Sequence, residues 1–513
     1  MNRFTVVIIL IMLSIGLMAQ NNYVDVPSPQ YPKIQDAIDY AETNPEILFI
    51  NLSCGTYNET LKIRNLTHNI TFRSSYSIGG DESVITNTII QAPVNSNSSV
   101  VTIYDCNSSV TFYGVSITGG TGTYRGGSLS EGGGILCYVN SNFTGSQNVN
   151  LQYTHIFANS AGSGGGINSR STNLSINNCS IFHNKLYGDD PEFPDLVRTG
   201  AGIYIFAGHN MINNSKIYNN DTFQDYNDVI AGTGGGIYWE SGGWVNNQYY
   251  SSLDIYGCQI FNNKAKNNAN SSLEKSSAIH AVPFTGGVNQ HHFSLKNCTI
   301  VDNLCYDENF GPYNYAVKYG GYSSDIQNSI IYNNRVGSTF FQLCDRQLCN
   351  YFAPVRAVHC DINGVFNENY YEQYLPGDPS ALLHNIDTDP LFVNESLNDY
   401  HLKWDADCIS PCIDHGSDRD DIELPGNPID IGALQFTDFQ SYFYKYTLPI
   451  TEPRTTYKWM SHPVLDNVRN NHDYDADMAL YLFDGLWDPE ILEWINWRTT
   501  NDGISNYLIY HDI

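Results

Sequence analysis

The chain has 513 residues, enough for several domains, yet only 15% of them are charged. Acidic residues outnumber basic residues by 53 to 25, which gives a formal net charge of −28. A protein with this charge repels a phosphate backbone, so nucleic acids are excluded as partners. The 42 glycines and 37 tyrosines are typical of stacked strands and turns and unusual for a helical protein.

Residues 1–19 have the pattern of a secretory signal peptide. Arg3 supplies the positive charge, residues 4–17 form an apolar run, and Ala19 is a small residue at which cleavage can fall. The alternative is a membrane anchor, but the run is short for a bilayer and no later stretch approaches about 20 apolar residues. We therefore expect a secreted or cell-surface protein with no transmembrane segment after the signal is cleaved.

Residues 32–46 are expected to form a short helix near the start of the mature chain. Ile34, Ala37, Ile38 and Ala41 recur at helical spacing, and strand-like sequence follows them. A helix in this place can cover the strand edges that the open end of a strand stack exposes.

A nine-residue pattern, INNCSIFHN at 176–184, recurs along much of the chain. Its second isoleucine stands at positions 117, 156, 181, 217, 260, 300, 331 and 362. A small residue stands two positions before each isoleucine, and an asparagine stands three positions after it at 159, 184, 220, 263, 303 and 334. Fixed motifs with variable spacers predict a solenoid, in which equivalent residues stack about 4.8 Å apart.

The two polar columns have different expected places. The small column, which includes Cys179, Cys258, Cys298 and Cys360, should fill a narrow interior where its thiols are buried. The asparagine column should occupy a corner, because its amides can bond to their copies above and below and asparagine tolerates left-handed backbone angles. Two further cysteine pairs are close enough in sequence to form local disulfides: Cys344 with Cys349, and Cys408 with Cys412.

A second motif, GGGI or a close variant, alternates with the first. Its isoleucine stands at 135, 167, 203, 237 and 279, and the shortest complete coil has 25 residues, from 156 to 181. Alternation of apolar and polar residues between the motifs predicts two or three short strands per coil, separated by Gly- or Asn-rich bends.

The paired GGGI and F-x-N signatures resemble the repeats of bacterial polymorphic outer-membrane proteins, and the whole pattern resembles the pectin-lyase-like superfamily. This resemblance implies an all-β fold, a right-handed parallel β-helix solenoid over residues 20–436, with a short N-terminal capping helix and repeats clearest over 110–363. Residues 386–436, which contain DPLFV and DIGALQ, are similar to the closing segment of secreted bacterial β-helix proteins. Residues 437–513 lack the repeats, and we predict a small, separate C-terminal module. A truncated gene product is the alternative.

Long insertions follow the asparagine column, and three of them combine aromatic residues with carboxylates. Aromatic faces stack against sugars, and carboxylates accept hydroxyl hydrogen bonds or bind Ca²⁺. The predicted ligand-binding residues are Tyr187, Asp189, Asp190, Glu192 and Asp195; Phe223, Asp225, Tyr226 and Asp228; and Tyr306, Asp307, Glu308 and Tyr313. Asp189, Asp190 and Asp195 are the candidate Ca²⁺ ligands. The alternative is a set of solvated acidic loops whose tyrosines pack on the barrel wall.

A further aromatic cluster follows the fourth glycine motif. Trp239, Trp244, Tyr249 and Tyr250 lie close together in sequence, and we expect them in a loop that extends another face of the rod.

The favoured function is a carbohydrate-binding or adhesive rod that is exported and associated with a cell surface, with a polysaccharide or surface glycan as its partner. The alternative, a polysaccharide lyase or glycoside hydrolase, is implied by β-helix families that cleave acidic polysaccharides. Its nearest candidates are the three aspartates above with Lys185, Arg198 or His209. The motifs of polygalacturonase-type hydrolases are missing, so no catalytic residue is assigned and we favour a protein that is not an enzyme. No cofactor is required, and Ca²⁺ is the one candidate.

Overall fold

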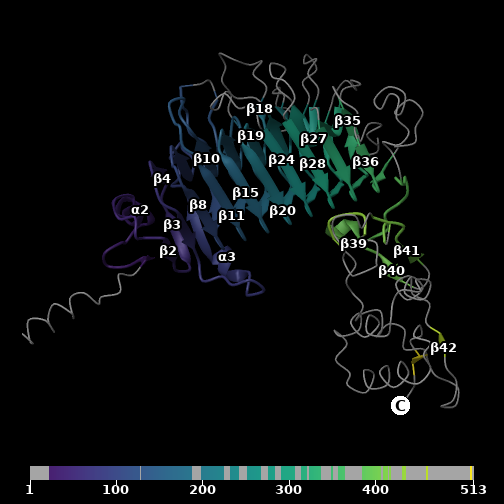
Figure 1. Ribbon diagram of the computed structural model, residues 1–513, viewed down its shortest axis with the longest axis horizontal. Coiled ribbons are helices and arrows are strands. Elements are labelled where there is room, and N and C mark those ends of the chain that lie inside the picture. Colours follow the sequence, from purple (N-terminus) through teal and green to yellow (C-terminus); the bar gives the residue numbers. More distant parts are fainter. Residues whose placement is uncertain are drawn as a thin grey trace, which may run out of the picture.

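The computed structural model describes residues 22–126, 129–187, 198–223, 232–241, 251–266, 275–282, 291–306, 314–319, 323–336, 348–350, 356–363, 384–405, 408–413, 415–416, 430–434, 458–459 and 509–510. Three long parallel sheets dominate this part of the chain (Figure 1). We call them sheets A, B and C.

The strands of each sheet follow one another along the stack, one coil after the next. Sheet A contains β1 (Tyr23–Val26), β2 (Phe49–Leu52), β5 (Ile70–Arg73), β8 (Ser109–Tyr113), β11 (Asn148–Gln152), β15 (Asn173–Asn177), β20 (His209–Asn213), β24 (Ser251–Tyr256), β28 (His291–Lys296), β32 (Ser323–Gln327) and β36 (Arg356–Val358). Sheet B contains β3 (Gly55–Asn58), β6 (Thr88–Gln91), β9 (Ser116–Thr118), β12 (His155–Phe157), β16 (Ser180–Phe182), β21 (Lys216–Tyr218), β25 (Gln259–Phe261), β29 (Thr299–Val301), β33 (Ile330–Tyr332) and β37 (Asp361–Ile362). Sheet C contains β4 (Leu61–Arg64), β7 (Val101–Tyr104), β10 (Ile135–Tyr138), β14 (Ile167–Arg170), β19 (Ile203–Phe206), β23 (Ile237–Glu240), β27 (Lys275–Val282), β31 (Asn314–Tyr319) and β35 (Leu348–Asn350).

Each coil places one strand in sheet A, then one in sheet B, then one in sheet C, and the next coil repeats the order. Within each sheet, neighbouring strands pair in parallel. The chain therefore forms the expected right-handed parallel β-helix. Shorter parallel ladders lie between sheets B and C along the chain: β13 (Ser160–Ala161) with β17 (Lys185–Leu186), β18 (Arg198–Thr199) with β22 (Gly232–Thr233), and β26 (Lys264–Lys266) with β30 (Leu304–Tyr306) and β34 (Arg335–Val336).

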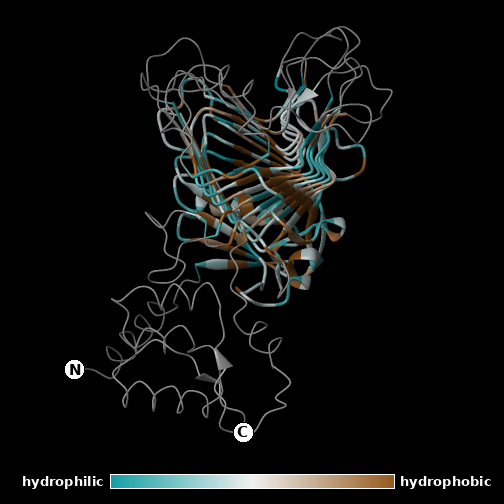
Figure 2. Cartoon of the chain, turned by 90° about the vertical axis from the view of Figure 1, so that its right-hand side faces the viewer, coloured by the Kyte–Doolittle hydropathy of each residue, from teal (hydrophilic) through white to brown (hydrophobic). Residues whose placement is uncertain are grey.

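The strand register confirms both isoleucine series. The first series, from Ile117 to Ile362, forms an unbroken column of paired residues in sheet B. The second, from Ile135 to Ile279, forms the equivalent column in sheet C. These side chains are fully buried, so the interior is a stack of aliphatic layers, and Figure 2 shows the hydrophobic colour concentrated on the stacked strands.

The N-terminal end is capped as predicted. Helix α2 (Ile34–Thr43) buries Ile34, Ala37, Ile38 and Ala41. The Glu59 carboxylate accepts hydrogen bonds from the first two backbone amides of the helix, at 3.0 and 3.1 Å. This bond ties the cap to the first coil and places a negative charge at the positive end of the helix dipole. A second short helix, α3 (Ser83–Asn87), precedes β6.

The closing segment folds back along the outer face of sheet B. Its strands β38 (Phe392–Asn394) and β39 (Asp399–Leu402) pair antiparallel around a 3-10 turn, η2 (Glu395–Leu397), and β40 (Trp404–Asp405) pairs with β41 (Cys408–Ile409). Tyr400 packs against Phe261 of sheet B at a ring-centroid distance of 5.2 Å. Figure 1 shows β39 to β41 beneath the last coils.

Two expectations need correction, those for Trp239 and for the cysteine pair Cys408 and Cys412, and several others concern residues that the structure does not describe. Trp239 does not extend an outer face: it points into the barrel, is fully buried and stacks on Phe293, while residues 242–250 are outside the described residues. Cys408 and Cys412 are free thiols, and the side chains of the pair at 344 and 349 are not described. Residues 1–19 and nearly all of 437–513 also lie outside, although β42 (Lys458–Trp459) pairs with β43 (Ile509–Tyr510).

The four column cysteines are buried, as predicted. Burial raises the pKa of both Cys179 and Cys360 to about 12. The thiolate form is therefore suppressed at neutral pH, and these residues act as small interior side chains.

Candidate functional site

The asparagine column fixes the corner that leads the chain from sheet B toward sheet C. In each step, one asparagine accepts two hydrogen bonds through its side-chain oxygen, from the backbone and the side-chain amides of the preceding copy. Asn220 Oδ1, for example, accepts from Asn184 N at 3.1 Å and from Asn184 Nδ2 at 3.0 Å. The Asn220 amide in turn donates to the Ile181 carbonyl and to Asn263 Oδ1, both at 2.9 Å. The corner is thus a continuous ladder of fully buried amides.

The expectation that the ladder asparagines are favoured for their tolerance of left-handed backbone angles is wrong. The ladder asparagines do not adopt the left-handed conformation, which belongs to the residue before each of them. These preceding residues are Ala158, His183, Asn219, Asn262, Asp302 and Asn333, with φ from 51° to 56°. Asparagine is therefore selected in the ladder for its hydrogen bonds and not for its backbone freedom.

The glycine motif exists because of this ladder. A Cβ on the third glycine of each turn would lie 2.9 to 3.3 Å from the amide nitrogen of a ladder asparagine, and 2.5 to 2.7 Å from a backbone carbonyl of the next coil. The glycines concerned are Gly134, Gly166, Gly202 and Gly236. The turn into sheet C can therefore pack this closely against the ladder only without a side chain, and this packing positions the strands that follow these four glycines: β10, β14, β19 and β23.

The sheet C strands carry one row of half-exposed side chains on their outer face. The row occupies the position three residues after the isoleucines at 135, 167, 203 and 237 and the equivalent position of β7, and Val282 of β27 continues the register. Its members are paired across neighbouring strands: Tyr104, Tyr138, Arg170, Phe206 and Glu240. We call these five residues the sheet C strip. Parallel strands are about 4.8 Å apart, so the strip presents three aromatic rings, one guanidinium and one carboxylate in a line of about 20 Å.

The rings and cations of the strip are held in place by direct contacts. Tyr104 and Tyr138 stack with their centroids 5.4 Å apart and their planes 6° from parallel. The guanidinium of Arg125 lies 4.1 Å from the centroid of the Tyr138 ring. Glu131, which Arg125 also contacts, pairs with Arg170 at 3.0 Å. Tyr104, Tyr138 and Arg170 are therefore oriented by neighbouring side chains before any ligand arrives.

Arg170 retains hydrogen-bonding capacity within the strip. Its guanidinium carbon lies 4.9 Å from the Tyr204 ring and 5.8 Å from the Phe206 ring. Its Nε atom is buried and has no hydrogen-bond acceptor among the described residues. A buried, unpaired donor is costly, so an acceptor from a ligand or water at this place would be favourable.

Glu240 ends the strip in an environment that favours its neutral form. Burial raises the pKa of Glu240, although the positive charge of Arg170 and a hydrogen bond from Tyr204 act in the opposite direction. The Tyr204 hydroxyl donates to Glu240 Oε2 at 3.4 Å. A carboxyl whose pKa is raised by burial takes up a proton more readily than an exposed one, and its protonated form donates as well as accepts hydrogen bonds.

A second, more deeply buried row supports the strip. Tyr204 and Tyr238 stack at 5.5 Å, and the ring of His280 continues the stack at 5.2 Å. Burial raises the pKa of both tyrosines. These rings are nearly covered or half covered, so they position the strip more than they extend it.

The predicted loop residues are brought together only in part. Tyr187 is exposed, at 49% of its accessible surface, but Phe223 is only 3% exposed and cannot offer its face to a sugar. Its ring lies 6.2 Å from the Tyr306 ring, and the Lys266 ammonium lies within 6 Å of both. Phe223 therefore fits the alternative interpretation, in which the aromatic rings of the insertions pack on the barrel wall. The other ten predicted residues lie outside the described residues: Asp189, Asp190, Glu192, Asp195, Asp225, Tyr226, Asp228, Asp307, Glu308 and Tyr313.

The basic catalytic candidates do not converge. Lys185 is exposed in β17 and Arg198 is buried in β18, both between sheets B and C along the chain. His209 lies in β20 on the outer face of sheet A, where its Nδ1 atom contacts Ser252 Oγ at 3.4 Å. These three residues are alternatives as the basic partner of the aspartates, and His209 lies on a different sheet from the other two because the chain passes through sheet C before it reaches β20.

No described group of three or more His, Cys, Asp or Glu side chains could hold a metal ion, and the candidate Ca²⁺ ligands are outside the described residues. None of the helices that the structure describes is long and apolar enough to span a membrane.

The sequence contained a signal for the strip that was not used. The position three residues after the isoleucines of the second series reads Tyr138, Arg170, Phe206, Glu240 and Val282. Registering this position in the same way as the asparagine column would have placed four of the five strip residues in one row.

Comparison with known proteins gives structural likeness only. No protein-family model matches the chain, and no curated protein matches it. Among solved structures, pectate lyase Pel9A is similar over 80% of this chain and 95% of its own, with 14% identity and a TM-score of 0.42. A pectin methylesterase from Aspergillus niger is similar over 72% and 91%, with 13% identity and a TM-score of 0.30. A pectin methylesterase in complex with a hexasaccharide is similar over 69% and 98%, with 11% identity and a TM-score of 0.24.

Proposed function

We propose that this protein is an exported, surface-associated β-helical rod that binds carbohydrate along the outer face of sheet C. The observation that carries the proposal is the sheet C strip, in which half-exposed rings, a guanidinium and a carboxyl stand in register on adjacent strands. Planar rings accept the C–H faces of sugars, and charged groups beside them accept or donate hydroxyl hydrogen bonds.

Two physical features favour a long polymer over a small molecule as the ligand. The strip is linear, and each step along it is one strand spacing, so neighbouring units of a chain can meet equivalent positions. Tyr104, Tyr138 and Arg170 are already held by stacking and by the contacts of Arg125 and Glu131, so ordering these three side chains on binding costs little entropy.

The cellular placement rests on the sequence. The predicted signal peptide leads out of the cytoplasm, and the similarity of the GGGI and F-x-N repeats to those of polymorphic outer-membrane proteins supports association with a cell surface. How the chain is attached to that surface is not part of the proposal.

Binding to immobilised and soluble polysaccharides, measured by affinity electrophoresis and calorimetry, tests the proposal. We expect Tyr138→Ala and Arg170→Gln each to weaken binding at least about 10-fold, or about 1.4 kcal/mol. Met211→Ala, which removes an exposed apolar side chain from the outer face of sheet A, is the matched control and should leave binding unchanged. If Tyr187→Ala abolishes binding while Tyr138→Ala does not, the ligand lies on the loops and the strip assignment is wrong.

A polysaccharide lyase or hydrolase remains the second candidate because of Glu240. A carboxyl with a raised pKa, on the same face as Arg170 and Tyr204, has the property required of a general acid. Mass spectrometry of polysaccharides incubated with the protein, with and without Ca²⁺, tests this candidate. New oligosaccharides that disappear with Glu240→Gln would establish an enzyme, and intact polymers that still bind would leave the rod.

A further inference from the structure

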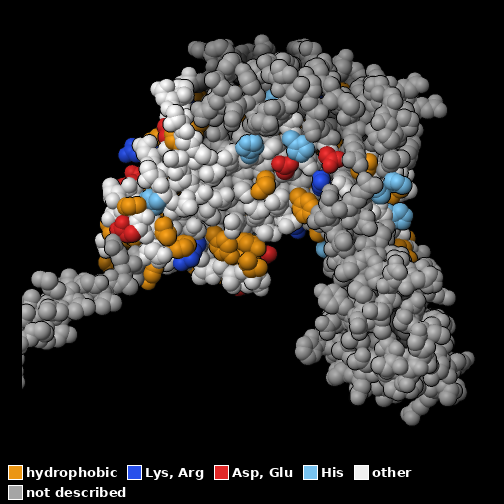
Figure 3. All heavy atoms as spheres, in the orientation of Figure 1, with side chains coloured by type: hydrophobic (Ala, Val, Ile, Leu, Met, Phe, Trp, Pro, Cys, Tyr) orange, Lys and Arg blue, Asp and Glu red, His pale blue; other side chains and the backbone are white. Residues whose placement is uncertain are grey.

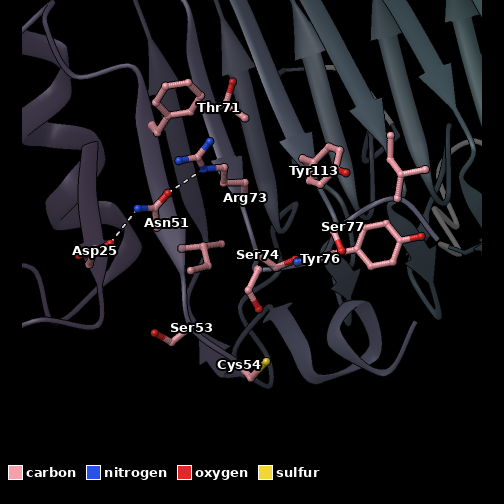
Figure 4. A pocket seen from close by; sticks show the side chains of 14 residues that line it. Asp25, Asn51, Ser53, Cys54, Thr71, Arg73, Ser74, Tyr76, Ser77 and Tyr113 are labelled. Atoms are coloured by element: carbon pink, nitrogen blue, oxygen red, sulfur yellow. Dashed lines mark hydrogen bonds between the residues drawn. The ribbon is translucent and has the colours of Figure 1, made fainter. Parts of the chain in front are cut away.

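A groove on a different face of the rod has its own chemistry. It has a volume of about 1030 Å³ and lies on the outer face of sheet A, at the N-terminal end of the β-helix (Figure 4). The first coils form its floor, and residues 74–78, which leave β5, form its wall.

Specific hydrogen bonds and close packing hold the wall of the groove against its floor. Ser74 N donates to the Tyr113 carbonyl at 3.1 Å, and Ser74 Oγ donates to the Gly114 carbonyl. Gly114 has a φ of +66°, and a Cβ there would lie 2.6 Å from Ser74 Oγ and 2.8 Å from Tyr76 Cβ. The glycine thus lets the wall approach the floor closely, and Tyr76 is brought to the rings of Tyr113 and Tyr153, at 6.1 and 5.2 Å.

One cation is positioned inside the groove. The Arg73 guanidinium lies over the Phe49 ring, 4.0 Å from its centroid. Its Nε atom donates to Asn51 Oδ1 at 2.8 Å, and Asn51 Nδ2 donates to Asp25 Oδ1 at 2.8 Å. Figure 4 shows this chain of hydrogen bonds along the groove floor. Because Asn51 separates the two charges, Asp25 orients the guanidinium without forming an ion pair with it.

The remaining edge of the guanidinium is available for recognition. Among the described residues, Arg73 makes no ion pair, and its only hydrogen bond uses Nε. The two Nη atoms form the fork that matches a carboxylate. Tyr113 is the register neighbour of Arg73 on the adjacent strand, so an aromatic ring stands one strand spacing, about 4.8 Å, from the fork.

We propose that this groove is a second sugar-binding site and that it takes a pyranose that carries a carboxylate. The ring of the sugar stacks on Tyr113 and Tyr76, and its carboxylate accepts hydrogen bonds from the two Nη atoms of Arg73. The hydroxyls of Thr71, Ser75 and Ser77, which line the groove, form hydrogen bonds with the hydroxyls of the sugar. A chain of net charge −28 repels acidic sugars in general, so an oriented arginine is the feature that admits one. Uronic acids and sialic acids share this chemistry.

The inference rests on the proposed carbohydrate binding but concerns a separate face, so the two can fail separately. Calorimetry with the full chain compares two pairs of probes: 3′-sialyllactose with lactose, and a hyaluronan tetrasaccharide with chitotetraose. We expect the acidic member of at least one pair to bind 10-fold or more tightly than its neutral partner. Arg73→Gln should abolish that preference, Tyr113→Ala should weaken binding of the acidic probe 5-fold or more, and added salt should reduce the preference.

Two control variants separate this site from nonspecific attraction and from the strip. Lys62→Gln removes an exposed cation from β4 and should leave the preference intact. Tyr138→Ala should also leave it intact, because Tyr138 lies on sheet C. The inference is overturned if acidic and neutral probes bind equally, if the preference survives Arg73→Gln in a variant with unchanged melting temperature, or if Tyr138→Ala removes it. In that last case the proposed function would stand and the groove assignment would fall.

Discussion

The asparagine ladder and the closing segment both bury polar side chains against the β-helix, but they form the hydrogen bonds of these side chains in opposite ways. We call the region where Tyr400 and Cys412 of the closing segment pack on sheet B the dock. Each ladder amide bonds to another copy of itself, so every interior step repeats the one before. The dock relies on contacts that occur once. Tyr400 donates to Asp302 Oδ2 at 3.0 Å, and Cys412 donates to Asp361 Oδ2 at 3.3 Å.

The difference is also one of charge. The ladder is neutral, so nothing in it titrates between pH 3 and 10. The dock buries two carboxyls whose pKa values are raised, mainly by burial. We therefore expect the ladder to contribute stability that does not change with pH and the dock to provide the sensitivity of the rod to pH.

Asn220→Ala should have the largest effect, because it interrupts the ladder in the middle. The substitution removes the side-chain partner of the Ile181 carbonyl and of Asn184 N, and one of the two acceptors of Asn184 Nδ2, which still donates to the Ile156 carbonyl at 2.9 Å. At about 1–3 kcal/mol for each buried unsatisfied group, we expect a loss of about 4 kcal/mol or more in the free energy of unfolding. Denaturant unfolding followed by circular dichroism measures it.

The matched control is Asn150→Ala, which removes an amide that reaches Thr111 Oγ1 at 3.2 Å on the half-exposed outer face of sheet A. Water can replace that bond, so the cost should stay below about 1 kcal/mol. Equal losses for the two variants would show that the ladder is no more important than a surface amide.

Gly202→Ala tests the second half of the same corner. The added Cβ would lie 2.5 Å from the Gly236 carbonyl oxygen and 3.1 Å from Asn220 Nδ2, so the coil spacing must give way. We expect a loss of about 3 kcal/mol, typical of a forced change in a packed interior. Gly126→Ala separates packing from backbone strain, since Gly126 has a φ of +88° but open space around its Cβ position. Its cost should be about 1 kcal/mol.

The same contrast explains what could be predicted from sequence. Repetition made the fold readable: Ile181, Asn184 and Cys179 recur in register because each coil meets the same neighbours, and the strand pairing confirms that register. The dock could be located as a segment, but its contacts could not be predicted. Tyr400 and Asp302 are 98 residues apart and occur once, so no pattern links them.

The candidate site was less predictable than the repeats and more predictable than the dock. The sequence places acidic and aromatic residues densely in the insertions, which made them the predicted ligand-binding residues, yet Phe223 is buried. The strip is sparse in sequence, with one residue per coil, and only the strand register brings Tyr138 and Arg170 side by side. The groove was also missed, because Arg73, Phe49 and Tyr113 come from three coils with no shared motif.

Titration of the dock should have the next largest effect. Burial raises the pKa of Asp361 from its ordinary 3.8 to about 7, and nearby Asp387 and Asp389 act in the same direction. The folded state therefore binds a proton that the opened state releases, so the stability of the dock is greatest below about pH 4 and falls as the pH rises to about 7. Between pH 5 and pH 7 the free energy of opening should fall by about 2 kcal/mol.

Hydrogen exchange measures this effect directly, after correction for the intrinsic pH dependence of exchange. The reporting amides are Ile386, which donates to the Cys360 carbonyl at 2.8 Å, and Thr388, which donates to Asp361 Oδ1 at 3.2 Å. Ladder amides such as Asn220 N serve as the internal reference and should show no such trend. Asp361→Asn should flatten the profile, and an unchanged slope would mean that another group titrates.

Tyr400→Phe should have the smallest effect and is the most specific test of the dock. The ring keeps its packing on Phe261 and Phe392, both at 5.2 Å. The substitution removes only the hydrogen bonds of the hydroxyl, the main one to Asp302 Oδ2 at 3.0 Å and a longer one to Asn398 Oδ1 at 3.4 Å. We expect opening of the dock to become easier by about 1 kcal/mol. The pKa of Asp302 should also rise further, because the Tyr400 hydroxyl now lowers it. Tyr332→Phe is the matched control, since Tyr332 packs on the same apolar cluster. Two outcomes would contradict this: Tyr332→Phe loosens the dock as much as Tyr400→Phe does, or the pKa of Asp302 does not change. Either would mean that apolar packing, and not the buried hydrogen bond, holds the closing segment. The ladder and the dock would then differ only in that the contacts of the ladder repeat.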